Sequence, residues 1–148
     1  MEKFGSVDDI LDFAIGEEEQ AAEFYLVLAG KMAKSWMHGV FEEFAAEEKG
    51  HKQKLEAVKS GEKQRWSKQK VADMKIADYV VDIEPKANME YQDALILAMK
   101  KEKSAFKLYS DLAASTDDGD LREVLLGLAQ EEAQHKLRFE IEYDNLME

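Results

Sequence analysis

The sequence predicts an all-α protein, a four-helix bundle built from two similar helical hairpins joined by one long crossover. The first observation is composition: 148 residues include one proline and eight glycines, and the abundant Ala, Leu, Glu and Lys favour helices. The second is periodicity, because apolar residues recur every three or four positions in four long stretches. The third is an internal repeat at a shift of 84 residues, which is too long for a solenoid unit and indicates a duplicated hairpin.

The first hairpin is expected over residues 6–60. Ser6 followed by two aspartates is a helix start signal, because a capping oxygen and early acidic residues suit the N-terminal end of a helix. Apolar stripes with helical spacing cover residues 10–32 and 40–58. Ser60-Gly61 is typical of a helix end, so the second helix should stop there.

The crossover is expected over residues 61–87 and the second hairpin over 88–147, all within a single domain covering 1–148. Asn88 is a candidate cap for the third helix, and the polar turn 117–120 separates the third helix from the fourth. Short turns make antiparallel neighbours, whereas a long crossover lets the third helix start at the same end as the first. We therefore expect two hairpins that point the same way.

The repeat also duplicates a set of acidic and histidine residues. Each half carries one lone Glu and one Glu-x-x-His pair, each in an apolar helical stripe. The six residues are Glu18, Glu48, His51, Glu102, Glu132 and His135. A single Glu-x-x-His pair is weak evidence in a Glu-rich chain, but burying four carboxylates without cations would be costly. The duplicated set therefore predicts a site for two metal ions.

The spacing of these residues places them at one level of the bundle. Each lone Glu lies 17 residues before the turn of its hairpin, and the paired Glu and His lie 13 and 16 residues after it. Similar distances from the turn mean similar heights in an antiparallel hairpin. A Glu and a His three positions apart share one helix face and can bind the same ion.

Two further pairs of duplicated residues lie near the predicted ligands. Tyr25 and Tyr109 follow the lone Glu residues by two turns. Each could bond a ligand carboxylate, or present an oxidisable ring to the metals, and an ordinary core tyrosine is the alternative. Glu47 and Glu131 each precede a ligand Glu, so they could orient an imidazole through its other nitrogen or lie in solvent.

Charge and composition exclude several classes of protein. The net charge of −12 argues against binding nucleic acid or anionic membranes. The absence of cysteine excludes structural disulfides and Cys-ligated zinc, iron–sulfur and rubredoxin-type centres. The N-terminal residues contain no apolar signal core, and no apolar run approaches membrane-spanning length. We therefore expect a soluble cytoplasmic protein without a nucleic-acid or membrane partner.

The ligand pattern resembles that of the ferritin-like di-iron carboxylate superfamily, and within it the rubrerythrin-like branch without a rubredoxin domain. The resemblance covers nearly the whole chain. It implies that Glu18, Glu48 and His51 hold one metal and that their repeat equivalents hold the other, with Glu48 and Glu132 bridging. Oxygen and imidazole ligands suit two iron ions per chain, and would also accept manganese or zinc. Rubrerythrins typically carry an extra Glu one turn after the lone Glu of the third helix, where this chain has Ala105.

The resemblance implies an oxidoreductase that reduces peroxide or dioxygen at a di-iron centre. Because the chain has no cysteine, its electrons must come from an external donor, such as a rubredoxin-type protein. Alternatives are an iron-binding and storage protein with ferroxidase activity on ferrous iron, a dimanganese catalase, and a zinc-bound structural bundle. We also expect a homodimer.

Overall fold

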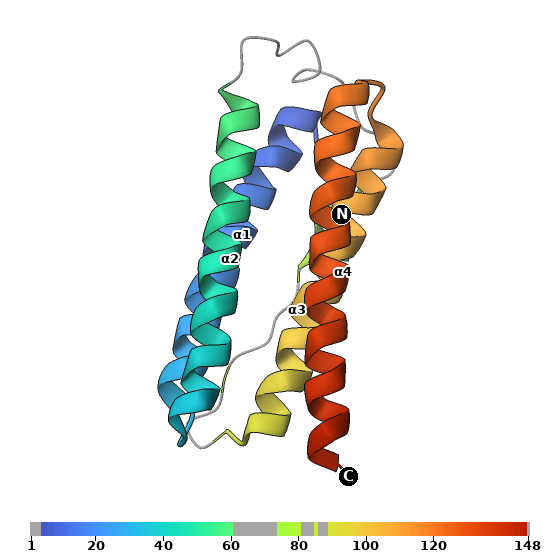
Figure 1. The fold of residues 1–148 in the computed structure, drawn as a ribbon. Helices are drawn as coiled ribbons and strands as arrows, with labels where there is room; N and C mark the ends of the chain where they lie inside the picture. Colours follow the sequence, from blue (N-terminus) through green and yellow to red (C-terminus); the bar gives the residue numbers. More distant parts are fainter. Residues whose placement is uncertain (1–3, 61–73, 81–84, 86–88, 148) are drawn as a thin grey trace.

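The computed structural model describes residues 4–60, 74–80, 85 and 89–147. Its elements are the long helices α1 (Val7–Lys31), α2 (Ser35–Lys59), α3 (Tyr91–Ser115) and α4 (Gly119–Met147), with a short 3₁₀ helix η1 (Ile76–Tyr79) before α3. The helices form an elongated bundle in which α1 packs on α2 and α3 packs on α4 (Figure 1). The predicted all-α four-helix bundle is therefore confirmed.

The relative direction of the two hairpins differs from the prediction. In Figure 1, α3 begins at the end of the bundle where α1 finishes, so the two helices are antiparallel. The side-chain bonds from Tyr25 to Glu102 and from Tyr109 to Glu18 agree, because residue numbers rise along one helix as they fall along the other. The expectation that the third helix starts at the same end as the first was wrong.

The physical reason for this error is that a long crossover has the opposite effect. Because α2 returns to the end of the bundle where α1 begins, a short connection would start α3 at that end, and a long crossover lets α3 start at the other end. The ligands meet in either case, because they lie close to the middle of their helices. Glu18 and Glu102 are each the twelfth residue of a 25-residue helix. A residue near the midpoint has nearly the same height whichever way its helix runs, so the height argument could not distinguish the two directions.

Side chains cap the starts of α1 and α4, whereas α2 and α3 begin without a side-chain cap. Ser6 caps α1, its Oγ accepting a hydrogen bond from the Asp9 backbone N–H at 3.3 Å. Asp118 acts similarly before α4, its Oδ1 accepting from the Leu121 N–H at 2.9 Å. The predicted cap Asn88 lies outside the described residues, and the residue at the start of α3 is Glu90, which makes no side-chain cap.

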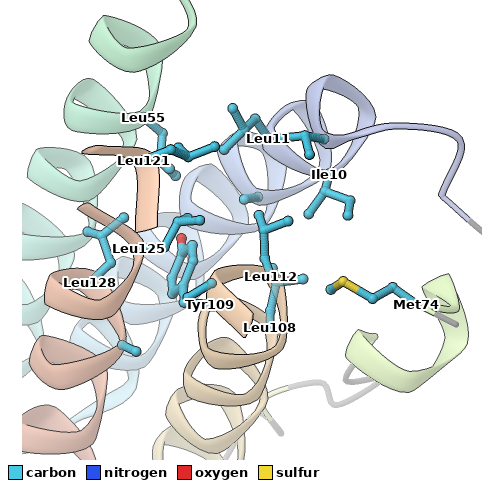
Figure 2. Packing of buried hydrophobic residues seen from close by; sticks show 14 of the residues in the cluster. Ile10, Leu11, Leu55, Met74, Leu108, Tyr109, Leu112, Leu121, Leu125 and Leu128 are labelled. Carbon is cyan, nitrogen blue, oxygen red and sulfur yellow. The ribbon is translucent and has the colours of Figure 1, made fainter. Parts of the chain in front are cut away.

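The apolar core forms two clusters, one on each side of the middle of the bundle. The first lies near the start of α1 and includes Leu11, Leu55, Leu112 and Leu125 (Figure 2). The second lies toward the other end and is rich in aromatic rings, which are contributed by Phe24, Tyr25, Phe41, Phe44, Tyr91 and Phe139. Between them the helices present polar side chains to one another, and these form the candidate site.

The described part of the crossover packs on α3. The Tyr79 hydroxyl donates to Asp111 at 2.7 Å, and the Ser104 hydroxyl donates to the Tyr79 carbonyl at 2.9 Å. Most of the predicted crossover, 61–87, lies outside the described residues. Within the described part of the chain, no helix is long and apolar enough to span a membrane.

Candidate metal centre

Six buried polar side chains, contributed by all four helices, meet at one level in the middle of the bundle. They are the residues singled out by the repeat: Glu18, Glu48, His51, Glu102, Glu132 and His135. The carboxylates are at most 2% exposed and the two imidazoles 6% exposed. Each side chain points inward because its position continues the core-facing stripe of its helix.

The six residues form two overlapping groups that could each hold a metal ion. The groups are Glu18, Glu48, His51 and Glu132, and Glu48, Glu102, Glu132 and His135, with one ligand atom per residue and all these atoms within 4.8 Å of one another. Glu48 and Glu132 belong to both groups. A carboxylate shared in this way is placed where a bridging ligand would lie, and their role as bridging ligands stays a prediction.

The polar atoms of the site are arranged to bind cations rather than to form hydrogen bonds with one another. Glu18 Oε2, Glu102 Oε2, Glu132 Oε1 and His51 Nδ1 are buried without a hydrogen-bond partner among the described residues. His51 Nδ1 lies 2.6 Å from Glu132 Oε1, yet the pair lacks hydrogen-bonding geometry. Buried acceptors without donors are costly, whereas atoms aimed at a common point are what metal coordination requires.

Each imidazole contacts a carboxylate of the opposite hairpin through its outer nitrogen. His51 Nε2 lies 2.7 Å from Glu131 Oε2, and His135 Nε2 lies 2.8 Å from Glu47 Oε2. The Nδ1 atoms face the buried carboxylates. The contact expected from sequence between these glutamates and the outer imidazole nitrogens is therefore present, although Glu47 Oε2 lies off the hydrogen-bonding direction. Such partners fix ring orientation.

The two tyrosines also act across the hairpins. Tyr25 on α1 donates to Glu102 Oε1 on α3 at 2.6 Å, and Tyr109 on α3 donates to Glu18 Oε1 on α1 at 2.5 Å. Both side chains are fully buried. Burial and the facing carboxylates, Glu102 and Glu18 respectively, raise the pKa of each hydroxyl well above its ordinary value, so both keep their protons and remain donors. A part in the chemistry stays a prediction.

Burial dominates the acid–base behaviour of the carboxylates. It raises the pKa of Glu48 and of Glu132 well above the ordinary value, and the negative charge of Glu102 raises both further. The pKa of Glu102 is lowered, because contacts with Glu132, His135 and Tyr25 outweigh the opposing effect of burial. In the metal-free protein the cluster therefore holds protons on some carboxylates, which a cation would displace.

Two openings border the site on opposite sides of the bundle. A cavity of about 30 Å³ lies between α1 and α3 and is lined by the four predicted ligand glutamates, together with residues that include Glu17, Ala21, Tyr79, Lys101 and Ala105. A groove of about 420 Å³ lies between α2 and α4 beside the outer edges of both imidazoles. The carboxylate side and the imidazole side of the site therefore open onto different faces.

Several lining residues were not anticipated from the sequence. Lys54 and Arg138 border the α2/α4 groove and are equivalent in the repeat, as are Glu17 and Lys101 at the α1/α3 cavity. The 84-residue shift could have identified both pairs as neighbours of the ligands. Tyr79 could not have been found in this way, because it comes from the crossover, which the repeat does not duplicate.

The fold has clear counterparts among solved structures. A ferritin-like di-iron carboxylate protein of Thermotoga maritima, described as putative, superposes with a TM-score of 0.83 at 21% identity, covering 97% of this chain and 98% of that one. A hypothetical protein of Pyrococcus furiosus gives a TM-score of 0.71 at 25% identity, covering 96% and 90%. The architecture is thus the ferritin-like four-helix bundle.

The family assignment is more specific than the fold. The rubrerythrin family model matches residues 9–143, which include all six residues of the site. The chain belongs to the rubrerythrin family. A comparison with curated proteins found no match.

The overlapping groups predict two metal ions per chain with separable affinities. Replacing His51 with Ala should weaken mainly the site that includes Glu18, and replacing His135 with Ala mainly the site that includes Glu102. Loss of a metal ligand should lower the affinity by more than the roughly 10–100-fold that is typical when a residue supporting a ligand is changed. Titration calorimetry with Co²⁺ or Fe²⁺ under anaerobic conditions measures both affinities. A single tight ion, lost entirely in either variant, would contradict the two-site arrangement.

The metal-free protein should lose stability as pH rises from 5.5 to 7.5. The raised pKa values of Glu48 and Glu132 mean that their stabilising contribution is complete below the unfolded value of about 4.3 and disappears as pH passes the folded value. His51, whose pKa is raised because contact with Glu18 outweighs burial, acts in the same direction, and Glu102 acts in the opposite one. Urea unfolding in a chelator at both pH values measures the change.

The control for this pH dependence removes the titrating groups. Replacing both Glu48 and Glu132 with Gln should flatten the dependence of the unfolding free energy on pH, whereas Gln at the exposed Glu42 should leave it as in the wild type. If the double variant keeps the wild-type slope, the buried carboxylates do not govern the stability of the metal-free protein.

Proposed function

We propose that this protein is a di-iron carboxylate oxidoreductase that reduces peroxide or dioxygen, with electrons supplied by a separate molecule. The observation that carries the proposal is the pair of overlapping four-residue groups that share Glu48 and Glu132. Two ions held through common carboxylates lie close enough to act on one small substrate together. Membership of the rubrerythrin family supports this assignment.

The ligand set supports iron as the metal. Four carboxylates and two imidazoles with no sulfur suit Fe or Mn, and the geometry does not exclude Zn. A bound iron pair would supply the two electrons that convert one hydrogen peroxide and two protons into two waters. The chain's own contribution is to fix the ligands: Tyr25 and Tyr109 restrain the lone carboxylates, and Glu47 and Glu131 border the imidazoles.

The α1/α3 cavity supports a small oxidant rather than a large organic one. On this measure a water requires about 10–15 Å³, so the cavity of about 30 Å³ has room for a molecule of two heavy atoms. Its walls include the small side chains of Ala21 and Ala105 next to Glu18 and Glu102. We infer that hydrogen peroxide or dioxygen reaches the carboxylate side of the site here.

The source of electrons follows from the composition. With no cysteine in the chain, a resident rubredoxin or iron–sulfur centre cannot supply them. The donor is therefore a rubredoxin-type protein or a small reductant in the cytoplasm, where we place this chain.

Reduced, iron-loaded protein should consume about one peroxide per metal pair and then stop, because one pair holds two electrons. Turnover should resume when rubredoxin and its reductase are added. An oxygen electrode and a peroxide assay, with iron determined on the same sample, measure both phases. Sustained oxygen release without a donor would point to a dimanganese catalase, and uptake of iron well beyond two ions per chain would point to storage.

Filling the α1/α3 cavity should separate metal binding from oxidant access. Leu in place of Ala105 should leave the affinity for two metal ions nearly unchanged but slow the reaction with peroxide by about tenfold or more, the scale of a steric mismatch in a small pocket. Azide binding to the oxidised protein, followed by its absorption band, gives a second readout. The matched control is Gly50→Ala in the α2/α4 groove, where an added Cβ meets no atom within 4 Å.

If Ala105→Leu reacts at the wild-type rate, the oxidant does not enter through the α1/α3 cavity and this assignment of the cavity is wrong. If Gly50→Ala slows the reaction as much as Ala105→Leu does, the effect is not specific to the α1/α3 cavity.

A further inference from the structure

One wall of the α1/α3 cavity comes from outside the four long helices. Tyr79, the last residue of η1, lines this cavity, and in the described part of the chain every other lining residue belongs to α1, α2, α3 or α4. Tyr79 is only 4% exposed, so the residue is packed against the bundle rather than turned toward solvent. The crossover therefore closes a part of the cavity that the long helices do not close.

Tyr79 is fixed at several points. Its hydroxyl donates to Asp111 Oδ2 at 2.7 Å, and its carbonyl oxygen accepts from the Ser104 hydroxyl at 2.9 Å. The Lys107 ammonium lies 5.1 Å from the centroid of its ring, which is within the range of a cation–π contact, and the centroid of the Phe4 ring lies 6.2 Å away. Burial and the Asp111 carboxylate raise the pKa of the hydroxyl, so it remains a donor near neutral pH. The ring is therefore held in one position at the cavity.

The residues of α3 that hold Tyr79 have no counterpart in the first hairpin. The positions on α1 that correspond to Ser104, Lys107 and Asp111, 84 residues earlier in the repeat, are exposed and carry different side chains: Gln20, Glu23 and Val27. Because α1 occupies the equivalent place in the bundle without these side chains, the packing of the long helices does not require them. On α3 they serve to place the crossover, and Tyr79 with it.

We propose that Tyr79 is a specificity-determining residue, whose ring limits the metal centre to hydrogen peroxide and dioxygen and excludes organic hydroperoxides. This inference rests on the function proposed above. The cavity of about 30 Å³ has room for only a few water-sized groups, and the Tyr79 ring takes up space on the crossover side. An organic hydroperoxide carries a carbon chain or ring behind its O–O bond, so its reacting end cannot reach the carboxylates while that space is filled.

The other large side chains at the cavity are less suited to set this limit. Glu17 and Lys101 are half-buried, and their long side chains can change rotamer to admit a larger molecule. Tyr109 is bulky and fixed, but its hydrogen bond to Glu18 sets it beside the metal ligands. Tyr79 combines bulk with a position that residues outside the ligand set hold in place. A wall that does not yield decides which molecules enter.

The first test measures access to the metal centre without turnover. In the full chain loaded with Co²⁺, the visible absorption of the metal reports the binding of formate and benzoate, two carboxylates that differ mainly in size. The wild type should bind benzoate at least about tenfold more weakly than formate, which is the scale of a steric mismatch in a small pocket. Tyr79→Ala should raise the affinity for benzoate by about tenfold or more and leave the affinity for formate nearly unchanged.

The second test measures the choice of oxidant. Stopped-flow absorption of the reduced, iron-loaded protein gives its rates with hydrogen peroxide and with cumene hydroperoxide. Each oxidant takes up two electrons and two protons as its O–O bond breaks, giving two waters from hydrogen peroxide and an alcohol and a water from cumene hydroperoxide. Tyr79→Ala should lower the ratio of the two rates by about tenfold or more, because the organic hydroperoxide reacts faster. Tyr79→Phe, which keeps the ring but loses the bond to Asp111, should keep a ratio close to that of the wild type.

Tyr91→Ala is the matched control for both tests. Tyr91 is also a buried tyrosine (6% exposed), and its hydroxyl donates to Glu142 at 3.1 Å, but it does not line the cavity. Its loss should lower stability without changing either selectivity. Helicity and metal stoichiometry show which variants are folded. If Tyr79→Ala does not fold, Tyr79→Leu removes the ring while keeping an apolar side chain, and it should change both selectivities in the same direction.

The outcomes separate this inference from the proposed function. If the folded Tyr79 variant keeps the wild-type benzoate affinity and the wild-type ratio of oxidant rates, or if Tyr91→Ala changes both equally, the inference is overturned. Reduction of hydrogen peroxide by the wild type would then still support the proposed function. If benzoate binds only when Tyr79 is replaced but the wild type reduces neither hydroperoxide, the size limit at Tyr79 is supported and the proposed function fails.

Discussion

The structure depends on the electrostatic problem posed by four carboxylates in the middle of an apolar bundle. Moving an ionised carboxylate out of water costs on the order of several kcal/mol even after relaxation, and these four side chains are at most 2% exposed. Burial explains the raised pKa values of Glu48 and Glu132. Burial also makes it costly that several of the site's polar atoms have no hydrogen-bond partner among the described residues. Bound cations would offset this cost and would thereby couple metal binding to folding.

The second constraint is that each hairpin restrains the ligands of the other. Tyr109 holds Glu18 and Tyr25 holds Glu102 on one side of the site. On the other side, Glu131 contacts His51 and Glu47 contacts His135. One hairpin alone would lack a partner for every one of these groups. The antiparallel relation of the two halves makes these contacts reciprocal, which is how a duplicated sequence builds a nearly symmetric centre.

The two hairpins differ from each other at several places on the surface of the bundle. The crossover covers one side of α3 through Tyr79, a residue that also lines the α1/α3 cavity. Glu17 and Lys101 occupy equivalent repeat positions at that cavity but carry opposite charges, and burial raises the pKa of Glu17. The outer face of α4 is apolar where that of α2 is polar. After duplication, the inner faces of both hairpins must keep the residues that build the site, whereas the residues of the outer faces can change.

The sequence by itself determined the helical class, the repeat, and the six residues that meet at one level. These follow from local periodicity and from distances to the two turns, which a one-dimensional pattern contains. The direction of the second hairpin was predicted wrongly from the length of the crossover. The ligand heights could not correct it, because Glu18 and Glu102 lie near the midpoints of their helices and both directions give the same height. The choice of cross-hairpin partner also required the tertiary structure. Sequence placed Glu47 beside Glu48, but only the packing of α2 against α4 sets it against His135 rather than the imidazole of its own hairpin. The cavity is decided in the same way, since its walls come from α1, α3 and the crossover, segments whose approach no local pattern records.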